Sequence, residues 1–200
     1  MTRQLGIYLF DQVEVLDFAG PYEVFTCASR VAARSNPAHP PFAVSTVART
    51  LAPVRARAGL QVLPDYDWDS VPALDVLIVP GGVVDAELTQ APVSAWLART
   101  AAQTELTASV CTGAFLLAQA GLLDGYSVTT HWEDQAALAA AYPQLRLAGR
   151  QRWIDHGRVL TSAGISAGID MSLYLVARLA GMALAQATAR QMEYDWNPAP

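Results

Sequence analysis

The sequence predicts an α/β fold in which a mostly parallel central sheet is covered by helices on both faces. Short apolar segments alternate along the chain with longer segments of helical periodicity, which is the pattern of repeated β-α-β units. Residues 76–79 are four consecutive aliphatic residues, typical of a strand buried on both faces. The 200 residues, 52% of them hydrophobic and 16% charged, suit a single domain over residues 1–200.

In the first half of the chain, turn-forming residues separate the apolar segments. A loop over residues 11–20 follows the first strand. Pro21 is expected to open the first helix, because proline suits the first helical position. Ala58 and Gly59 are expected to form the turn of a hairpin within residues 54–63. The expected strands are residues 5–10, 42–48 and 75–79, and the expected helices are residues 21–33 and 92–102.

The second half of the chain continues the alternation. A glycine follows the helix of residues 114–120, and Gly181 separates the last two helices. The dipeptide His156-Gly157 is a two-residue hairpin turn signal between residues 152–155 and 158–161. The expected strands are residues 106–110 and 126–130 together with that hairpin, and the expected helices are residues 114–120, 133–141, 166–179 and 183–194.

Cys111 lies between a short buried strand and a helix, in the tight turn Cys111-Thr112-Gly113. A strand, a sharp turn carrying a nucleophile and a helix form the geometry of a nucleophile elbow. The helix start directs positive partial charge and free N–H groups toward the sulfur, so the sequence predicts a reactive thiolate. The alternative is a structural cysteine in an ordinary strand-to-helix turn.

Gly81 and Gly82 directly follow the strand that ends at Val79-Pro80. Ligands of such sheets bind beyond the carboxyl ends of the strands. Glycines there let the backbone approach a ligand closely, and their N–H groups, with that of Thr112, would form an anion hole. The alternative is a tight turn with no role in binding.

Asp17 lies in an apolar segment between Leu16 and Phe18. Partial burial would raise the pKa of its carboxyl and make it a proton carrier near neutral pH. The alternative is an N-terminal helix cap. Glu14 and Glu23 are nearby competitors for the same role.

His131 ends the expected strand of residues 126–130 and is a candidate partner for Cys111. The alternative is a structural histidine that caps the next helix or packs on Trp132. No residue is identified from the sequence that would orient its ring. His39 and His156 lie in a loop and a turn and are assigned no role.

Several functions are not expected from the composition. The net charge of −5 argues against a nucleic-acid partner, and the 13 basic residues are all arginine, which excludes a catalytic lysine. No spacing of ligand residues predicts a metal site, and no glycine-rich phosphate loop predicts a cofactor. We therefore expect a small-molecule substrate with neither metal nor cofactor.

The cellular location is also constrained. No apolar run approaches the ~18 residues of a membrane span, and the N-terminus has no signal-peptide pattern. Two cysteines cannot form a disulfide framework, so a cytoplasmic protein without membrane contact is expected. Cys27 is expected to be a buried, inert thiol.

Four segments together resemble the ThiJ/PfpI superfamily, whose fold is similar to that of class I glutamine amidotransferases. Within this superfamily, the segment Leu16-Asp17-Phe18-Ala19-Gly20-Pro21 and the ending Gln191-Met192-Glu193-Tyr194 are most similar to isocyanide hydratases. The resemblance covers nearly the whole chain. The four segments are residues 109–114, 80–82, 129–132 and 163–170.

The resemblance implies a flavodoxin-like three-layer sandwich and a homodimer with the site near its interface. It implies that Cys111 is the nucleophile of a lyase and Asp17 its acid/base partner. It also implies that the N–H of Thr112 and the backbone of Gly81–Val83 contact the substrate. Ile165 would line the pocket near the attacking water.

Departures from related branches narrow the function. The protease-like branch has a histidine after the cysteine, where this chain has Thr112, so a peptidase triad is not expected. The sensory half of AraC-type regulators shares this domain, but no DNA-binding module is expected before Pro200. Isocyanide hydration is the leading hypothesis. The alternatives are glyoxalase- or amidase-type chemistry on small carbonyl compounds, and a redox- or ligand-sensing protein without turnover.

Overall fold

The computed structural model describes residues 1–199 and contains one large sheet. The strands of this sheet are β1 (Arg3–Tyr8), β2 (Phe42–Ala48), β5 (Tyr66–Asp67), β6 (Val76–Val79), β7 (Leu106–Val110), β10 (Trp153–Asp155) and β11 (Val159–Ser162). Their order is β10-β11-β7-β6-β1-β2-β5, and only the β10–β11 pair is antiparallel. The mostly parallel sheet expected from the sequence is confirmed.

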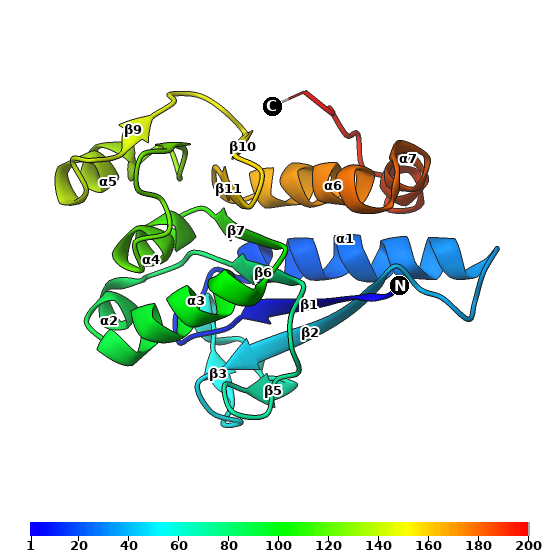
Figure 1. Cartoon of the computed structure of the whole chain (residues 1–200), viewed down its shortest axis with the longest axis horizontal. Helices are drawn as coiled ribbons and strands as arrows, with labels where there is room; N and C mark the ends of the chain where they lie inside the picture. The colour runs from blue at the N-terminus through cyan, green and yellow to red at the C-terminus, as the bar shows by residue number, and fades with distance from the viewer. Residues whose placement is uncertain (200) are drawn as a thin grey trace.

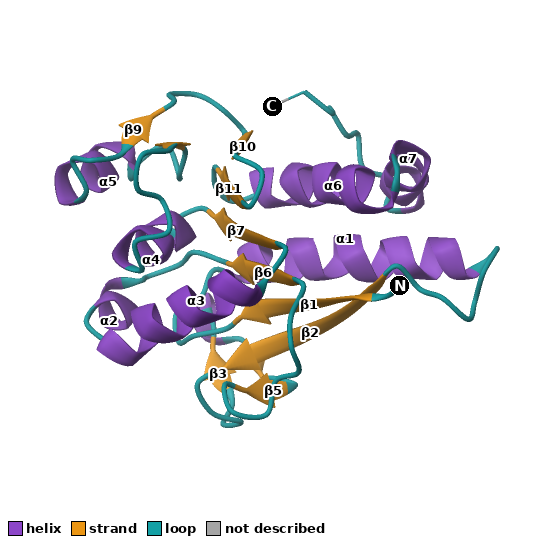
Figure 2. Ribbon diagram, viewed as in Figure 1, coloured by secondary structure: helices purple, strands orange, loops and turns teal. Residues whose placement is uncertain are grey.

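Helices cover both faces of this sheet (Figures 1 and 2). One face carries α1 (Val15–Ala33), α6 (Ala167–Ala180) and α7 (Met182–Gln191), which pack on one another. The other face carries α2 (Asp85–Leu88), α3 (Ala91–Gln103) and α4 (Gly113–Gln119). The predicted three-layer sandwich is therefore confirmed.

Smaller elements complete the chain. The hairpin expected within residues 54–63 is formed by β3 (Val54–Arg55) and β4 (Gln61–Val62), joined through the short 3₁₀ helix η1 (Arg57–Gly59). A separate pair, β8 (Ser127–Val128) with β9 (Arg146–Leu147), lies beside α5 (Gln135–Ala141). The strand expected over residues 126–130 is therefore shorter and lies outside the main sheet.

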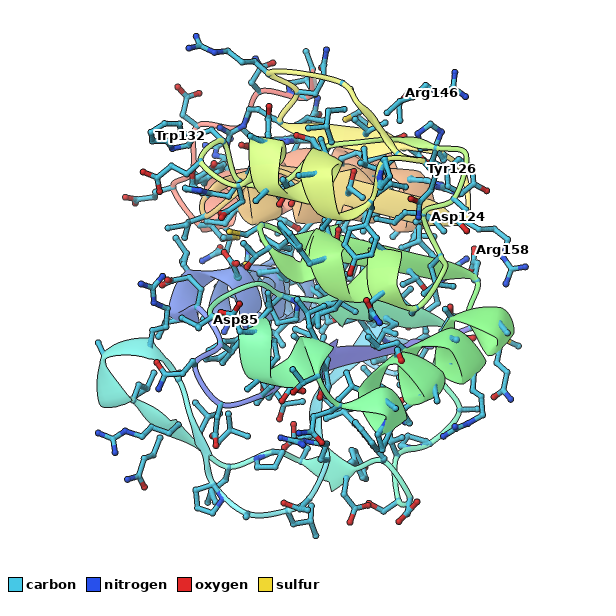
Figure 3. The ribbon with its side chains drawn as sticks, turned by 90° about the vertical axis from the view of Figure 1, so that its left-hand side faces the viewer. Asp85, Asp124, Tyr126, Trp132, Arg146 and Arg158 are labelled. Atoms are coloured by element: carbon cyan, nitrogen blue, oxygen red, sulfur yellow. The ribbon has the colours of Figure 1, made fainter. Side chains whose placement is uncertain are left out.

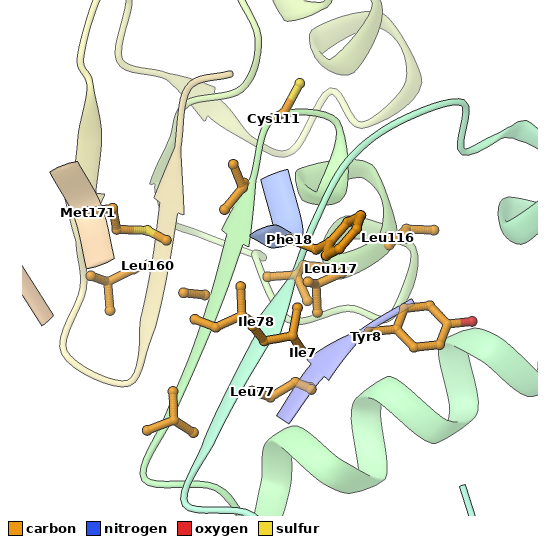
Figure 4. Close-up of a cluster of buried hydrophobic side chains, with 14 of the residues drawn as sticks. Ile7, Tyr8, Phe18, Leu77, Ile78, Cys111, Leu116, Leu117, Leu160 and Met171 are labelled. Carbon is orange, nitrogen blue, oxygen red and sulfur yellow. The ribbon is translucent and has the colours of Figure 1, made fainter. Parts of the chain in front are cut away.

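The core is centred on β1, β6 and β7, the middle strands of the sheet. Every residue of β6 and β7 is buried, because helices cover both sides of these strands. Figure 4 shows Ile7, Leu77 and Ile78 in the middle of this cluster, with Cys111 at its edge. The candidate nucleophile therefore lies at the edge of the buried core.

The start of the first helix differs from the expectation. Helix α1 begins at Val15, so Pro21 lies inside it and Asp17 lies in its first turn. A proline in a helix interior removes one backbone hydrogen bond and costs about 3 kcal/mol. Burial of Phe18, Val24 and Pro21 itself offsets that cost. The N-cap of α1 is Glu14, so the alternative that Asp17 caps this helix is wrong.

A buried polar network joins β1 to α2. The Tyr8 hydroxyl donates to Oε2 of Glu87 at 2.5 Å, and Arg49 contacts Oε1 of Glu87 at 3.0 Å. Glu87 is only 2% exposed, so removing a donor would leave a buried carboxylate oxygen unpaired. Tyr8→Phe is expected to lower the free energy of unfolding by about 1–3 kcal/mol in urea titrations. Tyr22→Phe, on the exposed side of α1, is the control, and equal effects of the two changes would contradict the prediction.

Two kinds of feature are absent from residues 1–199. No helix there is both long and apolar enough to cross a lipid bilayer. No cluster of three or more His, Cys, Asp or Glu side chains there is arranged to hold a metal ion.

Candidate active site

Cys111 occupies the sharp turn between β7 and α4. Its φ angle is 57°, a left-handed conformation that is uncommon for a residue other than glycine. Two hydrogen bonds hold this conformation: the Cys111 N–H donates to the Ser162 carbonyl at 3.1 Å, and the Thr130 hydroxyl donates to the Cys111 carbonyl at 2.8 Å. Figure 4 shows the sulfur directed away from the core. The turn therefore presents the thiol beyond the carboxyl end of the sheet.

Asp17 is completely buried beside this thiol. Its Oδ2 accepts a hydrogen bond from the Gly81 N–H at 3.1 Å, and its Oδ1 has no hydrogen-bond partner. Burial raises the pKa of the carboxyl from 3.8 to about 7, while the Gly81 N–H and the Cys111 thiol act in the opposite direction. Asp17 can therefore hold and release a proton near neutral pH.

The Cys111 thiol is not a thiolate of low pKa. Burial raises its pKa, and the negative charge of Asp17 raises it further, while the Thr112 N–H opposes both effects. The expectation of a free thiolate at the helix start is therefore wrong, because desolvation outweighs the backbone donor at a side chain only 7% exposed. Since both pKa values are raised, the two groups act as a pair that retains a proton at neutral pH.

The backbone amides after β6, expected to form an anion hole, are hydrogen-bonded within the protein. The Gly81 N–H donates to Asp17, the Gly82 N–H donates to the Thr112 hydroxyl at 2.8 Å, and the Val83 N–H donates to the Gln12 carbonyl at 3.1 Å. Each of the three donors has an acceptor within the protein, and the contact of this backbone with a substrate stays a prediction. Only the Thr112 N–H remains directed at the sulfur.

The two glycines allow close packing around the Cys111–Asp17 pair. Gly82 has a φ of 141°, and a β-carbon there would lie 2.2 Å from the Gln12 carbonyl oxygen. A β-carbon at Gly81 would lie 2.9 Å from Oδ2 of Asp17. Glycine at both positions lets this loop wrap around Asp17 and seal it from water.

A pocket of about 350 Å³ opens above the sulfur. Glu14 and Arg57 form an ion pair of 3.1 Å on one wall, and Ile165 lies on the pocket lining as expected. Val83 is half exposed and does not line the pocket. Glu23 pairs with Arg30 on the exposed face of α1, so it is not a competitor of Asp17. The lining consists of Glu14, Arg57, Gly82, Cys111, Thr112, His131, Glu133, Asp134 and Ile165.

His131 lies in the same pocket as Cys111. A β-carbon on Gly164 would lie 2.5 Å from Cδ2 of His131 and 2.7 Å from Sγ of Cys111, so the ring and the thiol flank the same glycine. Nδ1 of His131 lies 3.4 Å from Oδ2 of Asp134. No residue that orients this ring was identified from the sequence, whereas Asp134 is placed to do so in the structure.

The alternative role for His131, packing on Trp132, receives little support. The two rings are tilted with centroids 5.9 Å apart, and Trp132 is 72% exposed. Figure 3 shows Trp132 projecting outward from the edge of the molecule. The His131 side chain is 18% exposed and lines the pocket, so it faces the thiol more than the indole.

Sequence reasoning missed several residues that the fold brings to the site. Asp134 follows His131 by three residues. Two side chains at this spacing meet when the chain turns, so the spacing could have indicated that Asp134 contacts the imidazole. Gly164 stands in a segment used for the family resemblance, but nothing in its pattern indicated contact with Cys111. Arg57 lies in the turn of a distant hairpin and is placed only by tertiary packing.

Gly164→Ala tests the close approach of the thiol and the imidazole. The φ of Gly164 is compatible with alanine, so the change is expected to leave the fold intact while its methyl group pushes Cys111 and His131 apart. We expect a loss of at least about tenfold in the reaction of the thiol with a small electrophile, because misplacement by an ångström can cost up to a hundredfold. An unchanged rate, with an unchanged circular dichroism spectrum, would contradict this geometry.

The fold and the paired thiol and carboxyl define an α/β protein class with a cysteine at a strand-to-helix turn. The chain belongs to the DJ-1/PfpI family, whose model matches residues 3–178.

One relative of this chain is named as an enzyme and another as a transcriptional regulator. The chain is 37% identical to an isonitrile hydratase of Pseudomonas putida, over all of this chain and 81% of that protein. It is 34% identical to the HTH-type transcriptional regulator GbdR of Pseudomonas aeruginosa, over 96% of this chain. The chain spans about half the length of that regulator (51%).

Solved structures agree with this placement. A ThiJ/PfpI family protein from Pseudomonas syringae superposes with a TM-score of 0.85 at 30% identity, covering 99% of this chain and 77% of that one. Drosophila melanogaster DJ-1β superposes with a TM-score of 0.84 at 20% identity, covering 98% and 100%. The second likeness concerns the fold alone.

Proposed function

We propose that this protein is a lyase that hydrates isocyanides to N-substituted formamides. The observation that carries the proposal is the Cys111–Asp17 pair, a buried thiol and a buried carboxyl that together retain one proton at neutral pH. The 37% identity to an isonitrile hydratase over the whole chain supports it. The reaction requires a nucleophile and a proton donor, and it requires no metal or cofactor.

The first half of the reaction forms a thioimidate. Asp17 accepts the thiol proton as the sulfur of Cys111 bonds to the isocyanide carbon, and it returns that proton to the same carbon. The products are Cys111–S–CH=N–R and an ionised Asp17. A carboxyl with a pKa of about 7 suits both transfers, because proton carriers work best when their pKa lies near the operating pH.

The second half of the reaction adds water and releases the formamide. The ionised Asp17 accepts a proton from water as the oxygen bonds to the thioimidate carbon. Breaking of the C–S bond then releases the imidic acid R–N=CH–OH, and the sulfur recovers its proton from Asp17. The imidic acid tautomerises to the formamide R–NH–CHO, which moves the remaining water proton from oxygen to nitrogen. The net reaction adds one water to the isocyanide, and the Cys111–Asp17 pair returns to its starting state.

The charges at the pocket favour a neutral substrate. Glu14, Glu133 and Asp134 line the pocket together with a single arginine, Arg57, which is already paired with Glu14. An anionic substrate would meet uncompensated negative charge at the mouth, whereas an isocyanide is neutral. This argues against carboxylate-bearing compounds as substrates.

The test is direct turnover by the purified protein. Phenyl and cyclohexyl isocyanide are incubated with the wild type and with Cys111→Ala, and formamide is measured by mass spectrometry. Formamide production by the wild type alone is the expected result. If no isocyanide in a panel of aryl and alkyl compounds is converted faster than by the variant, the proposal fails. Methylglyoxal in a parallel assay, with lactate as the product, tests the glyoxalase alternative.

A ligand-sensing domain is a second candidate function. The observation that favours it is the 34% identity to the regulator GbdR over nearly the whole of this chain. A sensing domain would bind small molecules in the same pocket without consuming them. Saturable binding measured by calorimetry, with no product from any compound that binds, would favour this candidate over hydration.

A further inference from the structure

We propose that His131, positioned by Asp134, is a second proton carrier of the site that serves the hydration half-reaction. This inference rests on the proposed function and adds to it a group that acts on the nitrogen of the thioimidate. Adding water across a C=N bond requires two proton transfers, one from the water oxygen and one to the nitrogen. Asp17 can take the first proton, but it cannot supply the second at the same moment.

The orientation of the imidazole fits this role. Nδ1 faces the carboxylates of Asp134 and Glu133, at 3.4 Å and 3.8 Å. Cδ2 faces Gly164 and the thiol of Cys111. Nε2 is bonded to Cδ2 and therefore belongs to the same edge of the ring. Within residues 1–199, no hydrogen bond involves Nε2, so it is free to meet a ligand in the pocket.

Asp134 is placed to hold the ring of His131. Its N–H donates to the His131 carbonyl at 3.0 Å, which closes the turn and brings the two side chains together. It precedes α5, but its side chain makes no capping hydrogen bond there. A carboxylate opposite Nδ1 fixes the ring and stabilises an imidazolium, as in catalytic triads.

The other charged groups of the pocket lie on different elements. Glu14 and Arg57 form an ion pair on one wall, and Asp17 is buried beneath the sulfur. Glu133 is the only other carboxylate near the ring within the described chain, and its side chain is 64% exposed. The carboxylates nearest the ring therefore lie at Nδ1 and leave Nε2 for the substrate.

The proton movements balance when both groups act. As water adds, Asp17 accepts a proton from its oxygen while the His131 imidazolium donates a proton to nitrogen, giving Cys111–S–CH(OH)–NH–R. As this intermediate collapses, neutral His131 accepts the hydroxyl proton and the C–S bond breaks. Asp17 returns its proton to sulfur. The thiol, the carboxylate and the imidazolium are all restored.

The experiment separates the two half-reactions. His131→Gln is mixed with an excess of phenyl isocyanide, and intact-protein mass spectrometry follows the adduct on Cys111 while formamide release is measured. We expect at least about a hundredfold slower turnover, together with an adduct of the mass of one isocyanide that does not accumulate in the wild type. His39→Gln, in an exposed loop away from the pocket, is the matched control and is expected to behave as the wild type.

Each outcome decides the matter. Wild-type turnover by a folded His131→Gln variant overturns the inference and leaves the proposed function standing. Loss of both the adduct and turnover also overturns it, because His131 would then be needed before hydration. If the wild type itself converts no isocyanide, the proposed function fails rather than this inference alone.

The positioning role of Asp134 is tested by a measurement that does not depend on the overall stability of the protein, namely accumulation of the Cys111 adduct. The double variant Glu133→Gln/Asp134→Asn removes both carboxylates near Nδ1 and is expected to accumulate the same Cys111 adduct. Restoring aspartate at position 134, with Glu133→Gln kept, is expected to restore hydrolysis of the adduct. An adduct that persists after this restoration, or that never forms in the double variant, would overturn the role of Asp134.

Discussion

Cys111→Ala is expected to lower kcat for isocyanide hydration by more than about a thousandfold. The thiol is the group that bonds to the isocyanide carbon, and loss of a covalent nucleophile costs three to six orders of magnitude in enzymes that use one. The fold is expected to persist, because the turn is held through the backbone of residue 111 and not through its sulfur. The N–H of this residue donates to the Ser162 carbonyl, and its carbonyl accepts from the Thr130 hydroxyl. The measurement is kcat by formamide release, together with the thermal unfolding midpoint.

A matched control separates the role of this thiol from a general effect of losing a cysteine. Cys27 is completely buried in α1, and Cys27→Ala is expected to retain wild-type kcat. Intact mass after treatment with isocyanide adds a second readout, since the adduct requires Cys111 alone. Residual turnover above about a tenth of the wild-type rate in Cys111→Ala would contradict covalent catalysis by this residue.

The elements of the fold could be predicted where the apolar pattern was local. Strands β2, β6 and β7 and the β10–β11 hairpin fall at or close to the expected residues, because their apolar runs are short and bounded by turn residues. The start of α1 could not be predicted, because proline at position 21 is a strong local signal and only tertiary burial outweighs it. Two-residue strands such as β5 and β9 carry too little pattern to be recognised.

The residues of the site could be predicted more readily than their electrostatic states. The turn at Cys111 has a sequence signature, and the apolar neighbours of Asp17 indicated burial that the structure shows to be complete. The predicted thiolate was wrong, because the pKa of Cys111 depends on its burial and on the negative charge of Asp17. Both are decided by long-range contacts such as that of Asp17 with Gly81, which no local pattern reveals.

Asp17→Asn is expected to lower kcat by about a hundred- to ten-thousandfold. An amide cannot carry the proton between sulfur and carbon, and this range is typical for loss of a general acid–base group. The wild-type rate is expected to rise with pH through about 7, because the carboxyl must be ionised to accept the thiol proton. In the variant, the residual rate should no longer rise with pH near 7. If the rate of the variant still rises with pH near 7, that rise comes from the ionisation of a group other than Asp17.

The same substitution is expected to make the protein more resistant to unfolding above neutral pH. The folded-state pKa of Asp17 is raised from 3.8 to about 7, so its contribution to stability is fully present below pH 3.8 and is lost as the pH rises through 7. Ionising the buried carboxyl therefore costs the wild type up to about 4 kcal/mol at pH 8. Asparagine keeps the polar contact with Gly81 and never ionises. Urea titrations should show the stability of the variant rising relative to the wild type between pH 4 and pH 8. A difference independent of pH would mean that Asp17 is not the buried proton carrier on which the proposed chemistry depends.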